Sequence, residues 1–230
     1  MKKKRVLTLV LACMLVAALS VGATLAYLSS TSSTVTNSFT VGTGYVDPDP
    51  DPDHPDTEQA ILVDETDITN PNGPRVLENE YQDLLPGDER IKDPQVYLTG
   101  GSVESYVFVK VTGIEAAENE NIYVDGWNDA QWIKVYNLDG TEAAEDDTTG
   151  DGIYRYYSVV NYSDYTEEDE EYGKYIMVGA PIFTGIGYSG EVEELPEQFE
   201  SKIQIQACAV QNAQSFTEWT DAIATTGWVD

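Results

Sequence analysis

Apolar and polar residues alternate along several short stretches of the chain, in the pattern that is typical of β-strands. In residues 106–111 every second position is a valine. Within residues 202–211, isoleucine or alanine alternates with glutamine or Cys208 from position 203 to position 209. Similar short stretches, bounded by Gly, Pro or Asp, occupy residues 34–41, 61–63, 132–136, 153–160, 175–178 and 181–183. The pattern predicts an all-β fold, an antiparallel β-sandwich.

One helix is predicted close to the C-terminus. Ser215 and Glu218 have the spacing of a capping box, and Gly227 can end the helix. Apolar residues recur between them at helical spacing: Phe216, Trp219 and Ile223. We expect these aromatic side chains to make core contacts rather than to form a ligand cage.

The first residues of the chain have the pattern of a secretory signal peptide. Lys2 to Arg5 carry four positive charges, and an almost uninterrupted apolar run follows from Val6 to Leu19. The small residues Thr24 and Ala26 predict cleavage between Ala26 and Tyr27. The alternative is an uncleaved membrane anchor, because residues 6–28 are long enough to span a bilayer. After cleavage only Cys208 would remain, so we expect no internal disulfide framework.

Residues 47–56 alternate aspartate with proline and include His54, the only histidine of the chain. Proline removes backbone donors, and like charges extend the segment further, so it is interpreted as a solvated tether. The predicted organisation is therefore a signal peptide (1–26), an N-terminal strand region (27–46), a tether (47–58) and a β-sandwich domain (59–230).

The charge of the chain restricts its partners. Lys and Arg number 12 against 41 Asp and Glu, giving a formal charge of −29 over 230 residues, while 41% of the residues are apolar. The apolar share is enough for a real core. Repulsion of phosphates argues against nucleic acid and against anionic lipid surfaces. We expect any membrane contact to come only from an uncleaved signal segment. Removing the basic signal peptide would make the chain still more acidic.

Catalytic motifs are not evident. One histidine cannot supply a two-histidine zinc site, and a tether is a poor scaffold for an oriented base. We therefore expect no enzymatic activity. The acidic loop 139–152 offers oxygen ligands for calcium, although its spacing is not that of an EF-hand, and a merely solvated loop is the alternative. The candidate calcium ligands are Asp139, Glu145, Asp146, Asp147 and Asp151.

Several stretches, taken in order, resemble the TasA/camelysin family of SipW-dependent exported proteins of Gram-positive bacteria. They include the signal-peptide junction and a segment with Pro86-Gly87-Asp88 followed by Lys92-Asp93-Pro94. The matching stretches are residues 22–29, 36–42, 79–94, 105–111 and 204–213. No single motif is highly specific, but the ordered set covers most of the chain.

The resemblance implies a jelly-roll-like β-sandwich that is exported by a specialised signal peptidase to the cell surface or extracellular matrix. TasA-like members are biofilm fibre subunits, in which the N-terminal strand of one subunit completes the sheet of the next. Residues 34–41 alternate suitably for this role, and a ten-residue tether reaches about 30 Å. The alternative is that this strand pairs within its own sandwich. The donor residues would be Val35, Asn37, Phe39 and Val41.

Two other functions stay open at this point. Camelysin-like members of the family have been assigned a metallopeptidase activity. The acidic loops, residues 139–152 and the shorter run 167–171, are compatible with a monomeric calcium-binding adhesin. The partners expected for the structural function are copies of this chain or related surface proteins, besides the signal peptidase during export. Calcium is the only cofactor that the acidic loops suggest.

Overall fold

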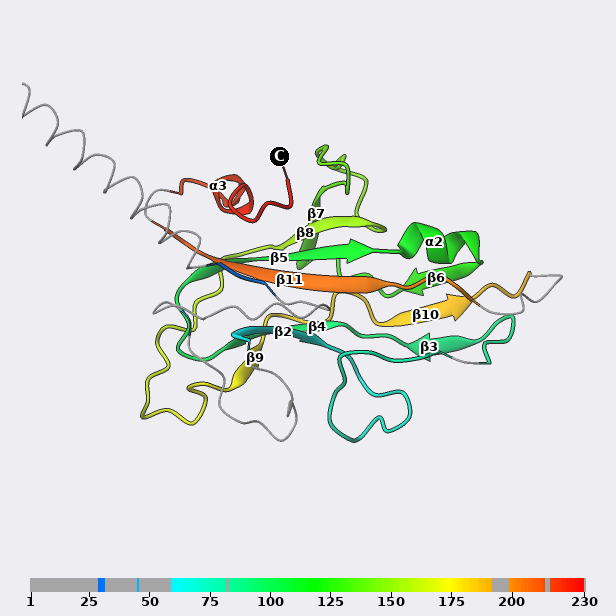
Figure 1. Ribbon diagram of the computed structural model, residues 1–230, viewed down its shortest axis with the longest axis horizontal. Helices are drawn as coiled ribbons and strands as arrows, with labels where there is room; N and C mark the ends of the chain where they lie inside the picture. Colours follow the sequence, from blue (N-terminus) through cyan, green and yellow to red (C-terminus); the bar gives the residue numbers. More distant parts are fainter. Residues whose placement is uncertain are drawn as a thin grey trace, which may run out of the picture.

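The computed structural model describes residues 29–31, 45, 59–81, 83–191, 199–213 and 216–229. Over these residues the chain forms mostly antiparallel β-strands, together with the short helices α2 (Ile114–Asn119) and α3 (Trp219–Ile223). The predicted all-β class is confirmed. Figure 1 shows two strand layers, with both helices lying on the side of the first layer. In the described part of the chain, no helix has the length and apolar character needed to cross a membrane.

The first layer is a five-stranded antiparallel sheet. Its strands, in spatial order, are β1 (Ser29–Thr31), β11 (Gln204–Gln211), β5 (Ser105–Thr112), β8 (Gly152–Tyr156) and β7 (Trp132–Tyr136). β11 pairs with β5 along its whole length, from Gln204 opposite Thr112 to Gln211 opposite Ser105. The last strand of the chain therefore lies inside this sheet, between β1 and β5.

The second layer contains two three-stranded sheets. One has the order β2 (Ile61–Asp64), β4 (Gln95–Thr99) and β9 (Tyr175–Met177), and the other β3 (Glu89–Ile91), β10 (Gly185–Tyr188) and β6 (Ile122–Asp125). β3 leads into β4, and β9 leads into β10. Between the two sheets, Lys92 N donates to Thr184 O (3.3 Å) and Ile182 N to Pro94 O (3.1 Å). The same two chain segments thus join both sheets into one layer.

The main core lies between the layers. The first layer contributes the inner faces of β5 and β11, and the second contributes β2 and β4. Trp132, Tyr154 and Phe183 are the large aromatic residues of this core, each at most 1% exposed. The alternation in the sequence is confirmed by the residues that line the inner face of the first layer: Val107, Val109, Val111, Ala207 and Ala209.

Helix α3 covers the outer face of the first layer. Phe108, Cys208 and Val210 on that face pack with Ala222 and Ile223 of the helix. The predicted aromatic residues Phe216 and Trp219 lie against the same cluster, so their assignment as packing residues is confirmed.

The start of α3 differs from the prediction. Glu218, rather than Ser215, is the N-cap, and Asp221 completes the capping box. Asp221 Oδ2 accepts hydrogen bonds from the backbone N–H of Thr217 (2.7 Å) and of Glu218 (3.3 Å). The helix thus begins one turn later than predicted, where an acidic side chain can satisfy its free N–H groups. Ser215 lies outside the described residues.

Two predicted strands also need correction. β8 ends at Tyr156, although the Tyr157 N–H still donates to Gln131 O (2.9 Å), next to the last strand pair of Trp132 and Tyr156. Residues 181–183 form no strand, although Ile182 and Phe183 are fully buried, and the strand of this region is β10 instead. The apolar run at 181–183 therefore reflects burial of these side chains in the core and not a β-strand.

A cluster of buried charges fixes residues 65–79 to the second layer. The Arg75 guanidinium bonds Asp64 Oδ1 (2.6 Å) and Asp93 Oδ2 (3.1 Å), and Lys92 Nζ bonds Glu65 Oε2 (2.8 Å). Burial tends to lower the pKa of Arg75, but the Asp64 hydrogen bond and nearby negative charges raise it overall. Lys92 and Asp93, which the sequence singled out, therefore each form an ion pair: a buried one with Glu65 and a half-buried one with Arg75.

We expect the protein to lose stability in alkali. Burial raises the pKa of Tyr162 to about 12, and burial also raises the pKa values of Tyr45, Tyr81 and Tyr154. An unfolded tyrosine ionises near pH 10. The stability is therefore fully present below about pH 10 and falls as the pH rises toward 12, because the unfolded chain releases these protons first. Circular dichroism followed as the pH rises should show the fold being lost above pH 10; a protein that keeps its folded spectrum beyond pH 12 would contradict this.

Candidate functional site

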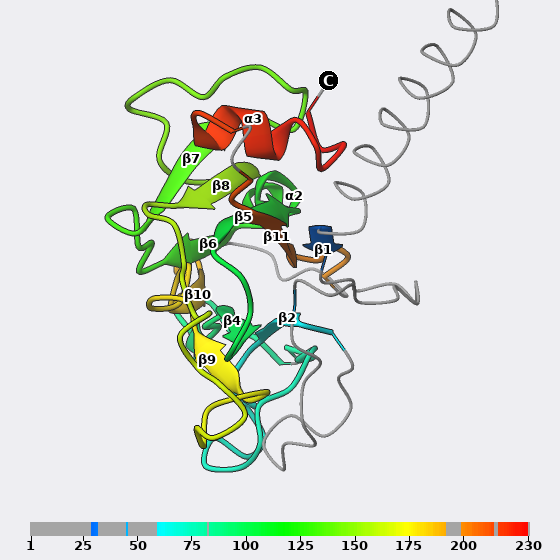
Figure 2. The same cartoon turned by 90° about the vertical axis from the view of Figure 1, so that its left-hand side faces the viewer.

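The N-terminal region contacts the sandwich at one edge of the first layer. β1 pairs antiparallel with β11, Ser29 opposite Val210 and Thr31 opposite Cys208. Figure 2 shows β1 as the short blue strand beside β11. Two segments that are far apart in the sequence, residues 29–31 and 204–211, thus lie side by side in one sheet. We call the outer side of β11, together with β1, the β11 edge.

Tyr45 is a second contact of the same region. Its side chain is 6% exposed and lies in the core between the two layers. The hydroxyl of Tyr45 lies 3.2 Å from Ser105 Oγ, which itself donates to Val103 O (2.8 Å). Since the serine proton is used in that bond, the tyrosine is the donor. Burial raises the pKa of Tyr45, so this phenol stays neutral.

The β11 edge is only partly covered. β1 pairs with residues 208–210, whereas β11 extends over eight residues. Among the described strands, none pairs with residues 204–206 on the side away from β5. A strand edge of this kind presents backbone N–H and C=O groups that another extended segment can bind.

The opposite edge of the first layer is protected by its own loop. After β7 the chain turns back, so that Tyr136 and Glu142 form a β-bridge. Ala143 N donates to Val135 O (3.0 Å), and Asn137 N donates to Thr141 O (2.8 Å). The loop therefore occupies part of the β7 edge, which leaves the β11 edge as the better place for strand addition.

The residues predicted for export and strand donation lie outside the described residues. These are the cleavage-site residues Ala26 and Tyr27, and the donor residues Val35, Asn37, Phe39 and Val41. Their roles stay predictions. β1 begins shortly after the predicted cleavage point, so cleavage there would leave β1 at a free N-terminus.

The five candidate calcium ligands are not brought together. Asp147 Oδ1 pairs with Lys134 Nζ (2.7 Å), and Asp151 Oδ1 accepts the backbone N–H of Ile114 (2.7 Å). Hydrogen bonds from the Thr141 hydroxyl and backbone N–H hold the pKa of Asp139 below its ordinary value.

Glu145 and Asp146 are exposed on the same loop. In the described ranges no group of three or more His, Cys, Asp or Glu side chains is arranged to hold a metal ion. Calcium binding by this loop therefore stays a prediction without geometric support.

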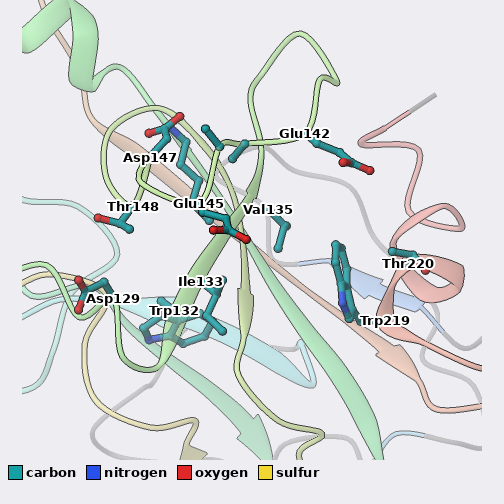
Figure 3. Close-up of a pocket in the computed structure, with 13 residues that line it drawn as sticks. Asp129, Trp132, Ile133, Val135, Glu142, Glu145, Asp147, Thr148, Trp219 and Thr220 are labelled. Atoms are coloured by element: carbon teal, nitrogen blue, oxygen red, sulfur yellow. The ribbon is translucent and has the colours of Figure 1, made fainter.

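The acidic loop instead forms one wall of a hollow of about 380 Å³, which we call the β7 hollow. In Figure 3, side chains of β7 lie between those of the loop and those of α3. The residues that line the β7 hollow are Asp129, Trp132, Ile133, Lys134, Val135, Glu142, Ala143, Ala144, Glu145, Asp147, Thr148, Trp219 and Thr220.

Sequence reasoning missed two features of this part of the molecule. One is Tyr45, a single aromatic residue directly before the Asp-Pro run, where an isolated aromatic in a polar region was the available signal. The other is the β7 hollow, whose walls come from residues 129–148 and 219–220. Comparisons with models of protein families, with curated proteins and with solved structures found no match.

Proposed function

We propose that this protein is a secreted structural protein of the cell surface or extracellular matrix, which assembles by exchanging its N-terminal region between copies. The observation that carries the proposal is the pairing of β1 with the β11 edge, together with the burial of Tyr45. The N-terminal region supplies both an edge strand and a core side chain. Within one chain these contacts complete the sandwich, and between chains the same contacts join neighbouring copies.

The positions of the two N-terminal contacts, β1 and Tyr45, support exchange. We call these two contacts the anchors. Tyr45 and Ile61 of β2 are separated by a stretch that includes the Asp-Pro tether of residues 47–56. An extended tether of this kind reaches about 30 Å, enough for the N-terminal region to contact a neighbouring sandwich. Because the donated N-terminal region and the β11 edge that receives it are different surfaces of the chain, exchange gives a head-to-tail contact that repeats in one direction.

The charge of the chain sets the conditions for assembly. A formal charge of −29 makes copies repel one another at low ionic strength. We therefore expect salt, low pH or divalent cations to favour assembly. Assembly that is indifferent to all three would show that charge repulsion does not control the contact between copies.

The proposal is tested by removing the N-terminal region. The chain from Tyr27 onward and the same chain without residues 27–44 are followed by light scattering and negative-stain microscopy. We expect the longer chain to form polymers and the shorter one to stay small. Equal polymerisation of both chains would show that the N-terminal region is not the donor.

Strand addition in trans gives a second, independent measurement. A synthetic peptide of residues 27–46 is added to the chain that lacks residues 27–44 and carries Tyr45→Ala, so that the binding places of both anchors are vacant. We expect the peptide to raise the melting temperature in a concentration-dependent way, because it binds only the folded sandwich. A scrambled peptide of the same composition is the control. Equal stabilisation by both peptides would contradict strand addition.

A further inference from the structure

We propose that the β7 hollow binds a basic side chain of a partner protein, presented on an extended segment that carries lysine or arginine. The floor of the hollow is apolar, since Ile133 and Val135 of β7, Ala143 of the loop and Trp219 of α3 all line it. Lysine and arginine have aliphatic stems that pack on such a surface while the charged end stays at the rim. This partner contact is distinct from the exchange at the β11 edge.

The rim of the hollow has the complementary charge. Asp129, Glu142 and Glu145 are exposed, and no ion pair joins any of them to a described basic residue. Lys134 is already neutralised by Asp147 and its side chain is only 5% exposed. These three carboxylates outnumber the one other described cation beside the hollow, the Arg155 guanidinium against Trp219. The hollow therefore attracts cations and repels anionic ligands.

The walls of the hollow are held in place before any ligand arrives. Lys134 Nζ donates to both Asp147 Oδ1 (2.7 Å) and Thr149 O (2.8 Å), which fixes the acidic loop over β7. On the other wall, the Trp219 ring lies edge-on to Tyr136 and 5.4 Å from the guanidinium carbon of Arg155. A preformed hollow loses little conformational entropy on binding, which favours affinity for a small contact.

The apolar floor and the acidic rim together favour an organic cation with an aliphatic stem over a bare metal ion. A bare hard cation needs six to eight oxygen ligands around it, and no described acidic group here is arranged in that way. An amphipathic organic cation instead uses both parts of the hollow, its stem against Ile133 and Trp219 and its charge near Glu142 and Glu145. The geometry therefore favours a basic side chain over a metal ion.

The test measures binding of a defined basic peptide to the full chain. The probe is a fluorescein-labelled, acetylated octapeptide of alternating glycine and lysine, followed by fluorescence anisotropy at low ionic strength. The double variant Glu142→Gln/Glu145→Gln is compared with Glu167→Gln/Glu168→Gln, which removes the same charge from an exposed acidic run elsewhere. We expect Kd to rise about ten-fold in the first variant and less than about two-fold in the second.

A second pair of variants tests whether filling the hollow prevents binding. One variant places a large side chain in the hollow, and its control places the same side chain elsewhere on the surface. Ala144 lines the hollow and Ala116 lies on α2, and both are exposed. We expect Ala144→Arg to abolish most of the peptide binding and Ala116→Arg to leave it nearly unchanged. Equal weakening within either matched pair would overturn the proposal, because it would show diffuse attraction to an acidic surface. Equal binding of a glycine-leucine octapeptide would also overturn it, because the occupant would then be apolar rather than basic.

Discussion

Replacing Arg75 by alanine is expected to lower the free energy of unfolding by about 3 kcal/mol. The side chain of Asp64 is only 2% exposed, and Arg75 Nε bonds its Oδ1 at 2.6 Å. Arg75 also donates to the carbonyl oxygens of Asp64 and Asp93, so one side chain joins the end of β2 and the connection between β3 and β4 to the 65–79 loop. Without it, a buried carboxylate loses its counter-charge, which costs much more than the loss of an exposed ion pair.

Arg90→Ala is the matched control for this experiment. Arg90 pairs with Asp88 at 2.7 Å, but the two side chains are 40% and 29% exposed. Exposed pairs contribute only about 0–1 kcal/mol, so this variant removes the same charge at little cost. Urea unfolding followed by circular dichroism measures both variants. Equal stability losses in the two would mean that the Arg75 cluster does not hold the loop in place.

Replacing Tyr45 by alanine is expected to lower the free energy of unfolding by about 3–4 kcal/mol. The ring fills space between the two layers, and no other side chain of the N-terminal region is described in that core. Tyr45→Phe keeps the ring and removes only the hydroxyl that donates to Ser105 Oγ, so it should cost about 1 kcal/mol. The difference between the two variants separates the packing of the ring from its hydrogen bond.

Thermal unfolding and light scattering should be measured together on the Tyr45 variants. If Tyr45 anchors the N-terminal region, Tyr45→Ala should weaken assembly as well as stability, because the exchanged contact uses the same core position. Tyr45→Phe should assemble almost normally. A Tyr45→Ala protein that is as stable as the original chain would show that this residue does not belong to the core.

The strands that the sequence predicts well are those with two different faces. β5 and β11 alternate because one face meets the core between the layers and the other meets α3 or solvent. β4 was missed because all five of its residues are buried, so no alternation exists. β10 was missed because Gly185 and Gly187 carry no side chains. The Tyr123 ring lies across Gly187, where a Cβ would come within 2.2 Å of Tyr123 Cζ.

The candidate site was less accessible to sequence reasoning than the fold. The many acidic residues in the loop 139–152 suggest a calcium site. In the structure, however, Asp147 forms an ion pair with Lys134, and Asp151 accepts a hydrogen bond from the backbone N–H of Ile114 at the start of α2. Such pairings depend on contacts between distant segments, which composition and spacing do not report. The same holds for the β7 hollow, because Trp219 approaches β7 only after α3 has packed on the first layer.

The position of β11 also determines when the sandwich can form during synthesis. β11 is the last strand of the chain, and it pairs with both β1 and β5. Until residues 204–211 have emerged, β5 lacks one of its two neighbours and the core lacks Ala207 and Ala209. Contacts between residues so far apart in sequence close large loops and form slowly. The sandwich should therefore stay unfolded until residues 204–211 have emerged, which is the state in which a polypeptide can be threaded through a narrow channel.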